Sequence, residues 1–397
     1  MTKLNDIVAV SAVRTPMGSF GGTLKDIASY HLGATAIKAA LEKSGFKGED
    51  LAEVIYGSCR QAGNGPNPSR SAAIYAGLPV GVTTNTLNMA CPSGMKSMML
   101  AAQGIMTGYG EVYMTGGMDS MSTIPYLLKN ARFAGFKMGD RKLEDGWSDS
   151  IDPTCGYGMG GTAENVAEKH NLTREEQDEF ALWSHQKALA AIDEGRFKNE
   201  IIPVTIPATR KTPEFKFDTD ETPRRNTSLE RLAKLKPAFR KGGTVTPGNA
   251  CGMSDGACAI VITTRERAKA IGATPLFSIV GMAGTAIDGT VMGEGPGFSI
   301  PMALEDAGMA LGDMDLYEVN EAFASQIISN IRRLDLERDK LNVNGGAIAL
   351  GHPTGISGAR IVITLYNALK QREKEIGVAS ICGGGGVTTA MVIKRES

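Results

Sequence analysis

Short apolar runs rich in β-branched residues alternate along this chain with longer segments of helical periodicity. Many of the runs are apolar on both faces, which is typical of strands buried between layers of helices. The alternation therefore predicts an α/β fold. The predicted strands are residues 7–13, 54–57, 112–115, 259–263, 276–280, 316–319, 378–382 and 390–394.

Two halves of the chain repeat the same order of motifs. Cys-Pro-Ser-Gly-Met at residues 91–95 resembles His-Pro-Thr-Gly-Ile at residues 352–356. Before both motifs, an Ala-Leu-Glu sequence (residues 40–42 and 303–305) is followed at the same spacing by a Gly and an Asp. A predicted strand ending in Gly-Gly follows both motifs. Coincidence among Gly- and Ala-rich segments is the alternative, but three matches in one order indicate a duplication. If the halves pack about a pseudo-twofold axis, Cys91 and His352 meet near that axis.

The segment from residue 122 to residue 248 carries more charge and proline than its surroundings. Residues 162–195 have a strongly helical pattern, and residues 171–176 within them carry an N-cap signature. Because the segment interrupts the first half, we interpret it as an inserted loop domain that lies over the site. The predicted domains are residues 1–270, which include the insertion at residues 122–248, and residues 271–397.

Composition excludes several classes of function. Lys and Arg number 42 against 43 Asp and Glu, interspersed, whereas nucleic-acid binding needs a clustered basic face. No apolar run reaches the ~20 residues that span a bilayer, and the start of the chain has no signal or transit pattern, so we expect no membrane partner. The six cysteines show no Cys-x-x-Cys pairing. Their spacing argues against a zinc site or a disulfide scaffold and predicts a cytoplasmic protein.

Cys91 and His352 are the main candidates for chemistry, because an imidazole can take the proton of a thiol and activate it as a nucleophile. Cys91 follows a β-like run and precedes an apolar helical stripe, with Pro92 at the first helical position. We therefore expect Cys91 to be an N-cap, where the helix dipole and free N–H groups favour the thiolate. His352 would serve as base or as donor to an oxyanion. The alternatives are a buried structural cysteine and a helix-capping histidine.

Two further positions lie where strands end. Cys382 opens the Gly run at residues 383–386, whose free N–H groups can point at a substrate oxygen. A second thiol there could move protons on a carbon acid, and a buried structural cysteine is the alternative. Asn320 follows the strand at residues 316–319, at the usual location of α/β active sites. It could anchor a catalytic water, or simply cap a helix.

With these pieces placed, the sequence closely resembles the thiolase family, nearly from end to end. The resemblance implies a five-layer α-β-α-β-α core of two similar halves with an inserted loop domain, in a dimer or tetramer. The matching segments are residues 13–16, 116–122, 159–165, 243–250, 320–324 and 345–353.

The resemblance also implies roles for the catalytic candidates. Cys91 would be the nucleophile that is acylated, and His352 the base that activates it and later a donor to the thioester oxygen. Cys382 would be an acid and base for the second thiol or the acetyl methyl group. Asn320 would hold a water that shares an oxyanion hole with His352. The N–H groups of Cys91 and Gly384 would form a second oxyanion hole.

Four other residues match positions near the substrate. Arg224 matches an arginine of the loop domain near the CoA nucleotide. Met159 and Phe323 match residues that line the pantetheine or acyl pocket. Cys251 stands near the pantetheine where the family usually has serine. Gly158 replaces a histidine common in short-chain biosynthetic members, which leaves the acyl chain length open.

The implied activity is a reversible Claisen condensation of two acetyl-CoA molecules to acetoacetyl-CoA and CoA, through an acetyl-cysteine. CoA thioesters would be substrates, and neither a metal nor another cofactor is expected. One alternative is a broader 3-ketoacyl-CoA thiolase of fatty-acid degradation. Others are a non-catalytic acyl-CoA or lipid-binding protein of this fold, and a Cys-His-Asn hydrolase, which leaves Cys382 unexplained.

Overall fold

The strands of both halves join in one ten-stranded sheet within the part of the chain that the computed structural model describes, residues 2–133, 135–147, 151–210 and 212–396. Every strand predicted from the sequence falls on one of these strands. The sheet contains β1 (Ile7–Arg14), β2 (Gly18–Ser19), β3 (Glu53–Gly57), β4 (Thr83–Leu87), β5 (Val112–Ser120), β8 (Ser254–Thr264), β9 (Phe277–Ala286), β10 (Leu316–Val319), β11 (Ile376–Cys382) and β12 (Val387–Arg395).

The strand order repeats between the two halves, as the sequence duplication predicts. The first half runs β1-β8-β5-β3-β4 and the second runs β9-β12-β11-β10. In both, antiparallel pairs lead to a parallel pair, β5 with β3 and β11 with β10. A parallel bridge between Tyr317 and Leu341 takes the place that β4 has in the first half. The halves are joined where β1 pairs antiparallel with β9.

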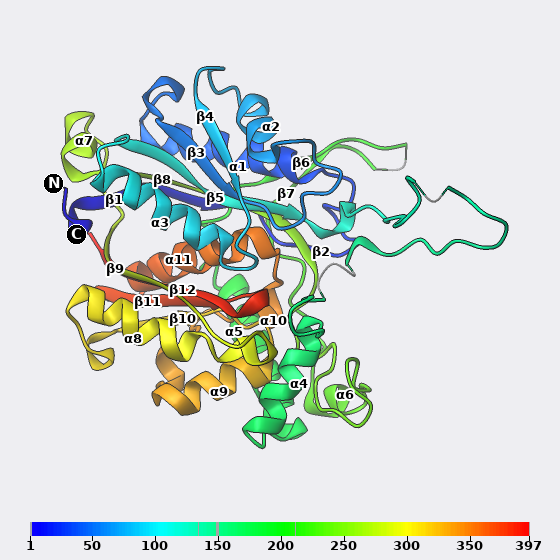
Figure 1. Ribbon diagram of the computed structural model, residues 1–397. Helices are drawn as coiled ribbons and strands as arrows, with labels where there is room; N and C mark the ends of the chain where they lie inside the picture. Colours follow the sequence, from blue (N-terminus) through cyan, green and yellow to red (C-terminus); the bar gives the residue numbers. More distant parts are fainter. Residues whose placement is uncertain (1, 134, 148–150, 211, 397) are drawn as a thin grey trace.

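Helices complete the predicted five layers (Figure 1). Apolar residues of α3 and α11 pack against both halves of the sheet and form the central layer. The outer face of the first half is covered by α1 and α2, and that of the second half by α8 and α9. These helices are α1 (Ser29–Ser44), α2 (Pro68–Tyr75), α3 (Ser93–Met106), α8 (Pro296–Ala307), α9 (Ala324–Leu334) and α11 (Thr354–Gln371).

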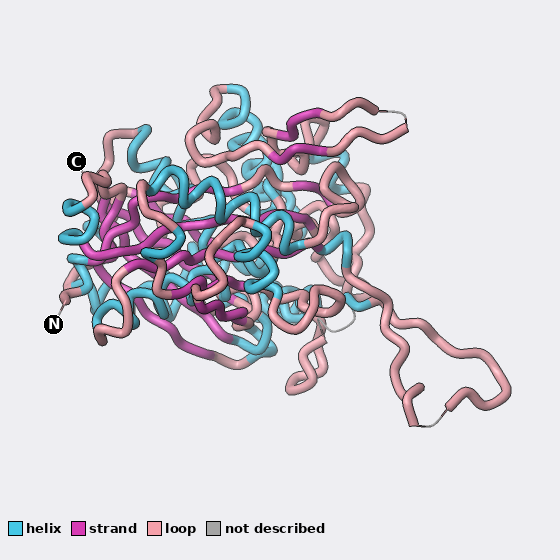
Figure 2. The backbone as a smooth tube through the Cα atoms, turned by 90° about the horizontal axis from the view of Figure 1, so that it is seen from above, coloured by secondary structure: helices cyan, strands magenta, loops and turns pink. Residues whose placement is uncertain are grey.

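The chain between β5 and β8 forms the insertion. Part of it is a long arm that projects from the body in both views and is closed at its base by two backbone hydrogen bonds between Leu127 and Glu144 (Figures 1 and 2). The remainder packs against both halves. Its elements are α4 (Met159–Lys169), α5 (Arg174–Asp193), β6 (Val204–Ile206), β7 (Phe215–Phe217) and α6 (Leu229–Ala233). The helices α4, α5 and α6 lie against the second half, and the hairpin of β6 and β7 lies against the first.

The helical piece predicted at residues 162–195 consists of two helices, and the second begins at the cap signature of residues 171–176. α4 ends at Lys169, and Asn171 has a φ of 51°, in the left-handed region that helices do not continue through. Thr173 then caps α5, with the capping box to Glu176 that the local sequence indicates. The predicted domain boundaries themselves stay a prediction.

A buried ion cluster ties the insertion to the first half. Arg14, at the end of β1, donates to Glu200 from Nε at 2.7 Å and to both carboxylate oxygens of Asp220 at 2.7 and 2.8 Å. Asp220 also accepts from the Met17 N–H at 2.7 Å. Because burying one of these charges alone would be costly, the segment that follows Asp220 is held in place.

The remaining helices are α7 (Arg265–Ala270) and α10 (Ala347–Leu350). Among the helices described, none has the length and apolar character to cross a membrane.

Candidate active site

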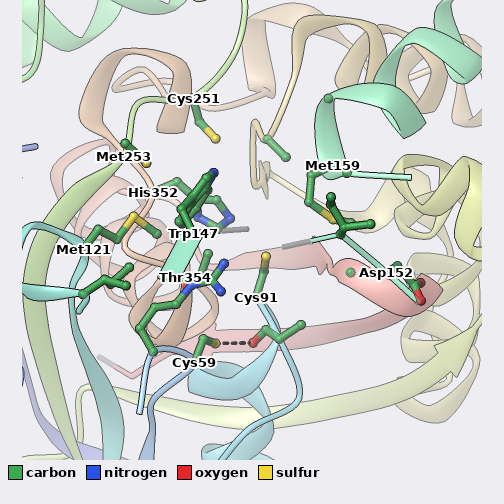
Figure 3. A pocket seen from close by; sticks show the side chains of 18 of the residues that line it. Cys59, Cys91, Met121, Trp147, Asp152, Met159, Cys251, Met253, His352 and Thr354 are labelled. Carbon is green, nitrogen blue, oxygen red and sulfur yellow. Dashed lines mark hydrogen bonds between the residues drawn. The ribbon is translucent and has the colours of Figure 1, made fainter. Parts of the chain in front are cut away.

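A cavity of about 1100 Å³ opens where the two halves and the insertion meet (Figure 3). Its wall combines loops from both copies of the repeat with the insertion, as the sequence prediction of a site near the pseudo-twofold axis requires. From the candidates named above, the wall contains Cys91, His352, Gly384, Arg224, Met159, Cys251 and Phe323.

Glycines bring the two motif copies into contact. A Cβ on Gly94 would lie 2.8 Å from the backbone nitrogen of Ala359, and one on Gly358 would lie 2.6 Å from that of Met95. The backbones of the N-terminal turns of α3 and α11 are therefore in direct contact. A side chain at either glycine would prevent this approach. This contact places Cys91 and His352 at one cavity.

Cys91 sits in a tight turn between β4 and α3. Ala90, just before it, has a φ of 51°, which is strained for a residue with a side chain. The Ser93 hydroxyl fixes the turn by donating to the Ala90 carbonyl at 2.6 Å and accepting from the Met89 N–H at 2.8 Å. The prediction that Cys91 is the N-cap is wrong, because the helix begins at Ser93 with Pro92 as its N-cap and Cys91 lies one residue before that cap.

The predicted preference of Cys91 for the thiolate is wrong for this state of the protein. Burial raises the pKa of Cys91 to about 11, although the charge of Arg60 and the N–H groups of Gly384 and Cys91 lower the pKa in part. The sulfur is therefore a thiol at neutral pH and needs a base. The same two N–H groups converge on the sulfur, where an oxyanion formed at Cys91 would need donors.

The hydrogen bonds of His352 define its tautomer. Its Nδ1 lies 2.7 Å from the Ser357 hydroxyl, which donates its only proton to the Pro353 carbonyl at 2.9 Å. Nδ1 must therefore carry the ring proton and donate, which leaves Nε2 as a lone-pair acceptor. Burial first, then the charges of Arg360 and Arg60, lower the pKa of His352 to about 3. A neutral imidazole with Nε2 available is what a base for Cys91 requires.

Cys382 and Asn320 lie deeper, each 1 % exposed, and neither is among the described residues that line the cavity. Cys382 is the last residue of β11, and Asn320 directly follows β10. The two strands pair, and the Asn320 N–H extends the pairing by donating to the Ser380 carbonyl at 2.9 Å. Burial raises the pKa of Cys382, and the nearby Cys91 raises it further, so the charges of the two thiolates would repel each other. Both polar atoms of the Asn320 side chain are buried without a hydrogen bond to a described residue.

The wall opposite Cys91 comes from the insertion and the Gly turn after β11. Met159 starts α4, and its sulfur would lie 3.2 Å from a Cβ on Gly384, a close approach. Phe323 meets Phe239 edge to face at 6.1 Å between ring centroids. A Cβ on Gly158 would have one neighbour within 4 Å, Ile151 at 3.9 Å, so this position is open.

Arg224 and Cys251 line the cavity farther from the turn. The Arg224 N–H donates to Nδ1 of His185 at 3.2 Å. We had no role for His185 from the sequence, yet burial and the Arg224 charge lower its pKa to about 4, which keeps it a neutral acceptor. The Cys251 N–H donates to the Ala322 carbonyl at 3.0 Å, and burial raises the pKa of its thiol.

Sequence reasoning missed Arg60, Trp147 and Asp119. Arg60 and Trp147 line the cavity, with the guanidinium carbon 4.4 Å from the indole centroid. The buried Asp119 accepts from the N–H groups of Cys59 and Arg60 and from Thr354 beside His352. Asp119 ends the Gly-Gly strand of the repeat, a position that could have marked it. In the described ranges no three His, Cys, Asp or Glu side chains converge as a metal site.

Comparison with known proteins identifies similar chains over the whole length. A family model described as the thiolase N-terminal domain matches residues 7–266, and one described as the thiolase C-terminal domain matches residues 273–395. The acetyl-CoA acetyltransferase of Pseudomonas aeruginosa is 48% identical over 99% of this chain and 100% of its own. That of Escherichia coli is 47% identical over 99% and 100%.

Solved structures agree. The acetyl-CoA acetyltransferase of Bacillus anthracis superposes with a TM-score of 0.96 at 43% identity, covering 100% of both chains. The human mitochondrial 3-ketoacyl-CoA thiolase in complex with CoA superposes with a TM-score of 0.94 at 42% identity, covering 98% of both chains.

Proposed function

Because the chain belongs to the thiolase family of acyltransferases, we propose that it joins two acetyl-CoA molecules into acetoacetyl-CoA and CoA, reversibly, through an acetyl-Cys91 intermediate. The observation that carries the proposal is the pairing of a buried Cys91 thiol, under converging N–H donors, with a neutral His352 whose Nε2 is an acceptor in the same cavity. The names of its relatives, acetyl-CoA acetyltransferases, support the substrate.

The first half-reaction forms the acetyl-enzyme. His352 takes the proton of Cys91, and the sulfur attacks the thioester carbonyl of acetyl-CoA. The N–H groups of Cys91 and Gly384 stabilise the oxyanion. The C–S bond to CoA breaks, and the CoA thiolate takes a proton from Cys382, which becomes a thiolate. The acetyl group then resides on Cys91.

The second half-reaction makes the carbon–carbon bond. The Cys382 thiolate removes a methyl proton from a second acetyl-CoA, and the enolate oxygen is stabilised by protonated His352 with a water held by Asn320. The enolate attacks acetyl-Cys91, and the C–S bond to Cys91 breaks. The departing sulfur recovers the proton from His352, so protons and electrons balance. Arg224, Met159, Cys251 and Phe323 would bind the CoA arm.

The intermediate is directly testable. A brief pulse of acetyl-CoA followed by acid quench and peptide mass spectrometry should place one acetyl group on the Cys91 peptide. Cys382→Ser should still accept this label but fail to exchange the acetyl methyl protons in D₂O. A label on Cys382 alone, or none on Cys91, would contradict the proposal.

Broader chain-length range is a second candidate, and one feature of the cavity favours it. The open space at Gly158 and the volume of about 1100 Å³ leave room beside Met159 for longer acyl groups. We expect acetoacetyl-CoA to be the best thiolysis substrate. A kcat/KM series over 3-oxoacyl-CoA chains of four to ten carbons decides between the two, because a profile that rises toward eight carbons assigns the degradative range.

We also propose that the chain works as a homodimer or homotetramer. β4 is an edge strand of the sheet, and such edges readily pair with another chain. Light scattering during size-exclusion chromatography gives the mass directly, and a monomer would contradict this expectation.

A further inference from the structure

Asp119 is a buried carboxylate that hydrogen-bonds to the turn after His352 from the half of the molecule that carries Cys91. The reaction proposed above gives it no role, and it is not among the described residues that line the cavity. We propose that Asp119 is a positioning residue for acylation, which keeps His352 where its Nε2 can take the proton of Cys91. The inference rests on the proposed function, since the step that it serves is the acylation of Cys91.

The hydrogen bonds described at the Asp119 side chain, which is 0% exposed, all come from donors. Oδ1 accepts from the N–H groups of Cys59 at 3.0 Å and Arg60 at 3.1 Å. Oδ2 accepts from the Thr354 hydroxyl at 2.8 Å and the Gly355 N–H at 2.6 Å. Burial raises the pKa of Asp119, while the donors on Arg60, Thr354 and Gly355 lower it in part. A carboxylate is the form that can accept from all of these donors at once.

These hydrogen bonds join the two halves of the molecule beside the reacting groups. Cys59 and Arg60 follow β3 in the first half, whereas Thr354 and Gly355 begin α11 in the second, directly after the turn of His352. Figure 3 shows His352, Thr354 and Cys91 around the same cavity. The carboxylate also lies at the N-terminus of α11, where the helix dipole favours a negative charge. Asp119 therefore ties the helix that follows His352 to the sheet of the first half.

Backbone packing places the same turn directly on that sheet. A Cβ on Gly57 would lie 2.4 Å from the Gly355 carbonyl oxygen, and one on Gly117 would lie 2.3 Å from it. The carbonyl of Gly355 thus rests on β3 and β5, while the N–H of the same residue binds Asp119 near the end of β5. Packing limits how closely the turn can approach, whereas the directional hydrogen bonds to Asp119 fix where it lies.

The charge of Asp119 opposes the activation of Cys91, so any benefit to acylation can come only from geometry. Burial is the largest cause of the raised pKa of Cys91, and the negative charge of Asp119 adds to the rise. Loss of that charge alone would make the thiolate easier to form and acylation faster. Loss of the position of His352 would make acylation slower, because the imidazole must lie within hydrogen-bond reach of the thiol. The two effects have opposite signs, and an experiment can distinguish them.

The test measures acylation of Cys91 in a single turnover. The full-length enzyme is mixed with acetyl-CoA and quenched with acid at increasing times, and mass spectrometry gives the fraction acetylated on Cys91. Asp119→Asn, which is similar in size and has no charge, should acetylate at least about fivefold more slowly than the wild type. A smaller decrease, or an increase, overturns the proposal.

A double-mutant cycle with His352→Ala shows whether Asp119 acts through the imidazole. Once the imidazole is absent, its position no longer matters. Asp119→Asn should therefore leave the slow acetylation of His352→Ala unchanged, or raise it through the lost charge. Slowing by the same factor in both backgrounds would mean that Asp119 only supports the fold, which overturns the proposal.

Asp255→Asn is the matched control. Asp255 is also 0% exposed, lies on β8 and accepts from the Ser122 N–H at 2.9 Å, with no described hydrogen bond to residues 352–355. The variant should lose unfolding free energy, as Asp119→Asn does, yet acetylate within about twofold of the wild type. Slowing equal to that of Asp119→Asn would show a general effect of a lost buried carboxylate and would overturn the proposal.

Thr354→Val decides the question if circular dichroism shows that Asp119→Asn does not fold. It removes a donor from the other end of the bridge and keeps Asp119, so acetylation should fall, and only where His352 is present. No fall overturns the proposal. A wild type that gains no acetyl group on Cys91 overturns the proposed function instead. The rate of Cys91 alkylation by iodoacetamide then replaces acetylation, and the same order of variants decides for or against Asp119.

Discussion

The two copies of the repeated turn have the same scaffold and opposite chemistry. Each leads into a central helix, and the backbones of these two helices meet at Gly94 of α3 and Gly358 of α11. Burial shifts the pKa of both reactive groups, but in opposite directions: it raises that of Cys91 to about 11 and lowers that of His352 to about 3. Duplication thus supplies geometry, and burial keeps both groups neutral until a substrate arrives.

The largest difference between the two turns should appear when the reactive sulfur of Cys91 is removed. Cys91→Ser should reduce kcat for acetoacetyl-CoA thiolysis by at least about 10³-fold, because a hydroxyl is far harder to ionise than a thiol. The variant should keep its fold, since serine is slightly smaller than cysteine. Steady-state rates together with the far-UV circular dichroism spectrum check both points, and turnover within tenfold of wild type would assign the nucleophile elsewhere.

A smaller effect is expected when His352 is kept but the hydrogen bond that fixes its tautomer is removed. Ser357→Ala removes the acceptor for Nδ1–H, so the ring can turn or place its proton on Nε2, and kcat/KM should fall about 10- to 100-fold. Ser97→Ala is the matched control on α3, where the hydroxyl donates to the Gly94 carbonyl at 2.7 Å without contact to the imidazole. Each should lose about 1–2 kcal/mol of unfolding free energy. Equal losses of activity in both variants would make Ser357 purely structural.

The backbone contact between α3 and α11 should be sensitive to a side chain added from either helix. Gly94→Ala and Gly358→Ala each introduce a Cβ less than 3 Å from the opposite helix. Each should lower the free energy of unfolding by about 1–3 kcal/mol through overpacking, with a moderate loss of rate. Urea unfolding measures the change, and Gly81→Ala, which meets no atom within 4 Å, is the control. A neutral result at either glycine would show that the two helices do not need backbone contact at that position.

The smallest expected effect is that of pH. With the pKa of Cys91 at about 11 and that of His352 at about 3, the free enzyme holds a thiol and a neutral base throughout the neutral range. His352 protonates only in strong acid, and Cys91 ionises only in strong base. The kcat/KM for acetoacetyl-CoA should therefore vary less than about threefold between pH 6 and pH 9. A rise through pH 6.5 would show that His352 titrates normally and is more exposed than the structure indicates.

Much of the fold was predictable because its signals are local. Strands apolar on both faces, such as residues 259–263, and the Thr173 cap of α5 depend on residues that are neighbours in sequence. The repeat also predicted that Cys91 and His352 share a site. The same cap signature marks the start of α5 after Asn171, whose φ of 51° separates it from α4.

The residues around the reacting groups could not be predicted in the same way. Arg60, Asp119 and Trp147 come from three separate segments, and they meet only because the C-terminal ends of β3 and β5 lie beside the insertion. His185 likewise acquires its contact with Arg224 from the path of the insertion.

The sequence by itself determined which chemical groups are present and the order of elements that carries them, since periodicity and turn residues act within a few positions. Tertiary structure decided their state. Burial made Cys91 a thiol and His352 a neutral imidazole, and Ser357 chose the ring nitrogen that holds the proton. Ionisation and tautomer depend on desolvation and on contacts between distant segments, and these exist only once the two halves have packed together.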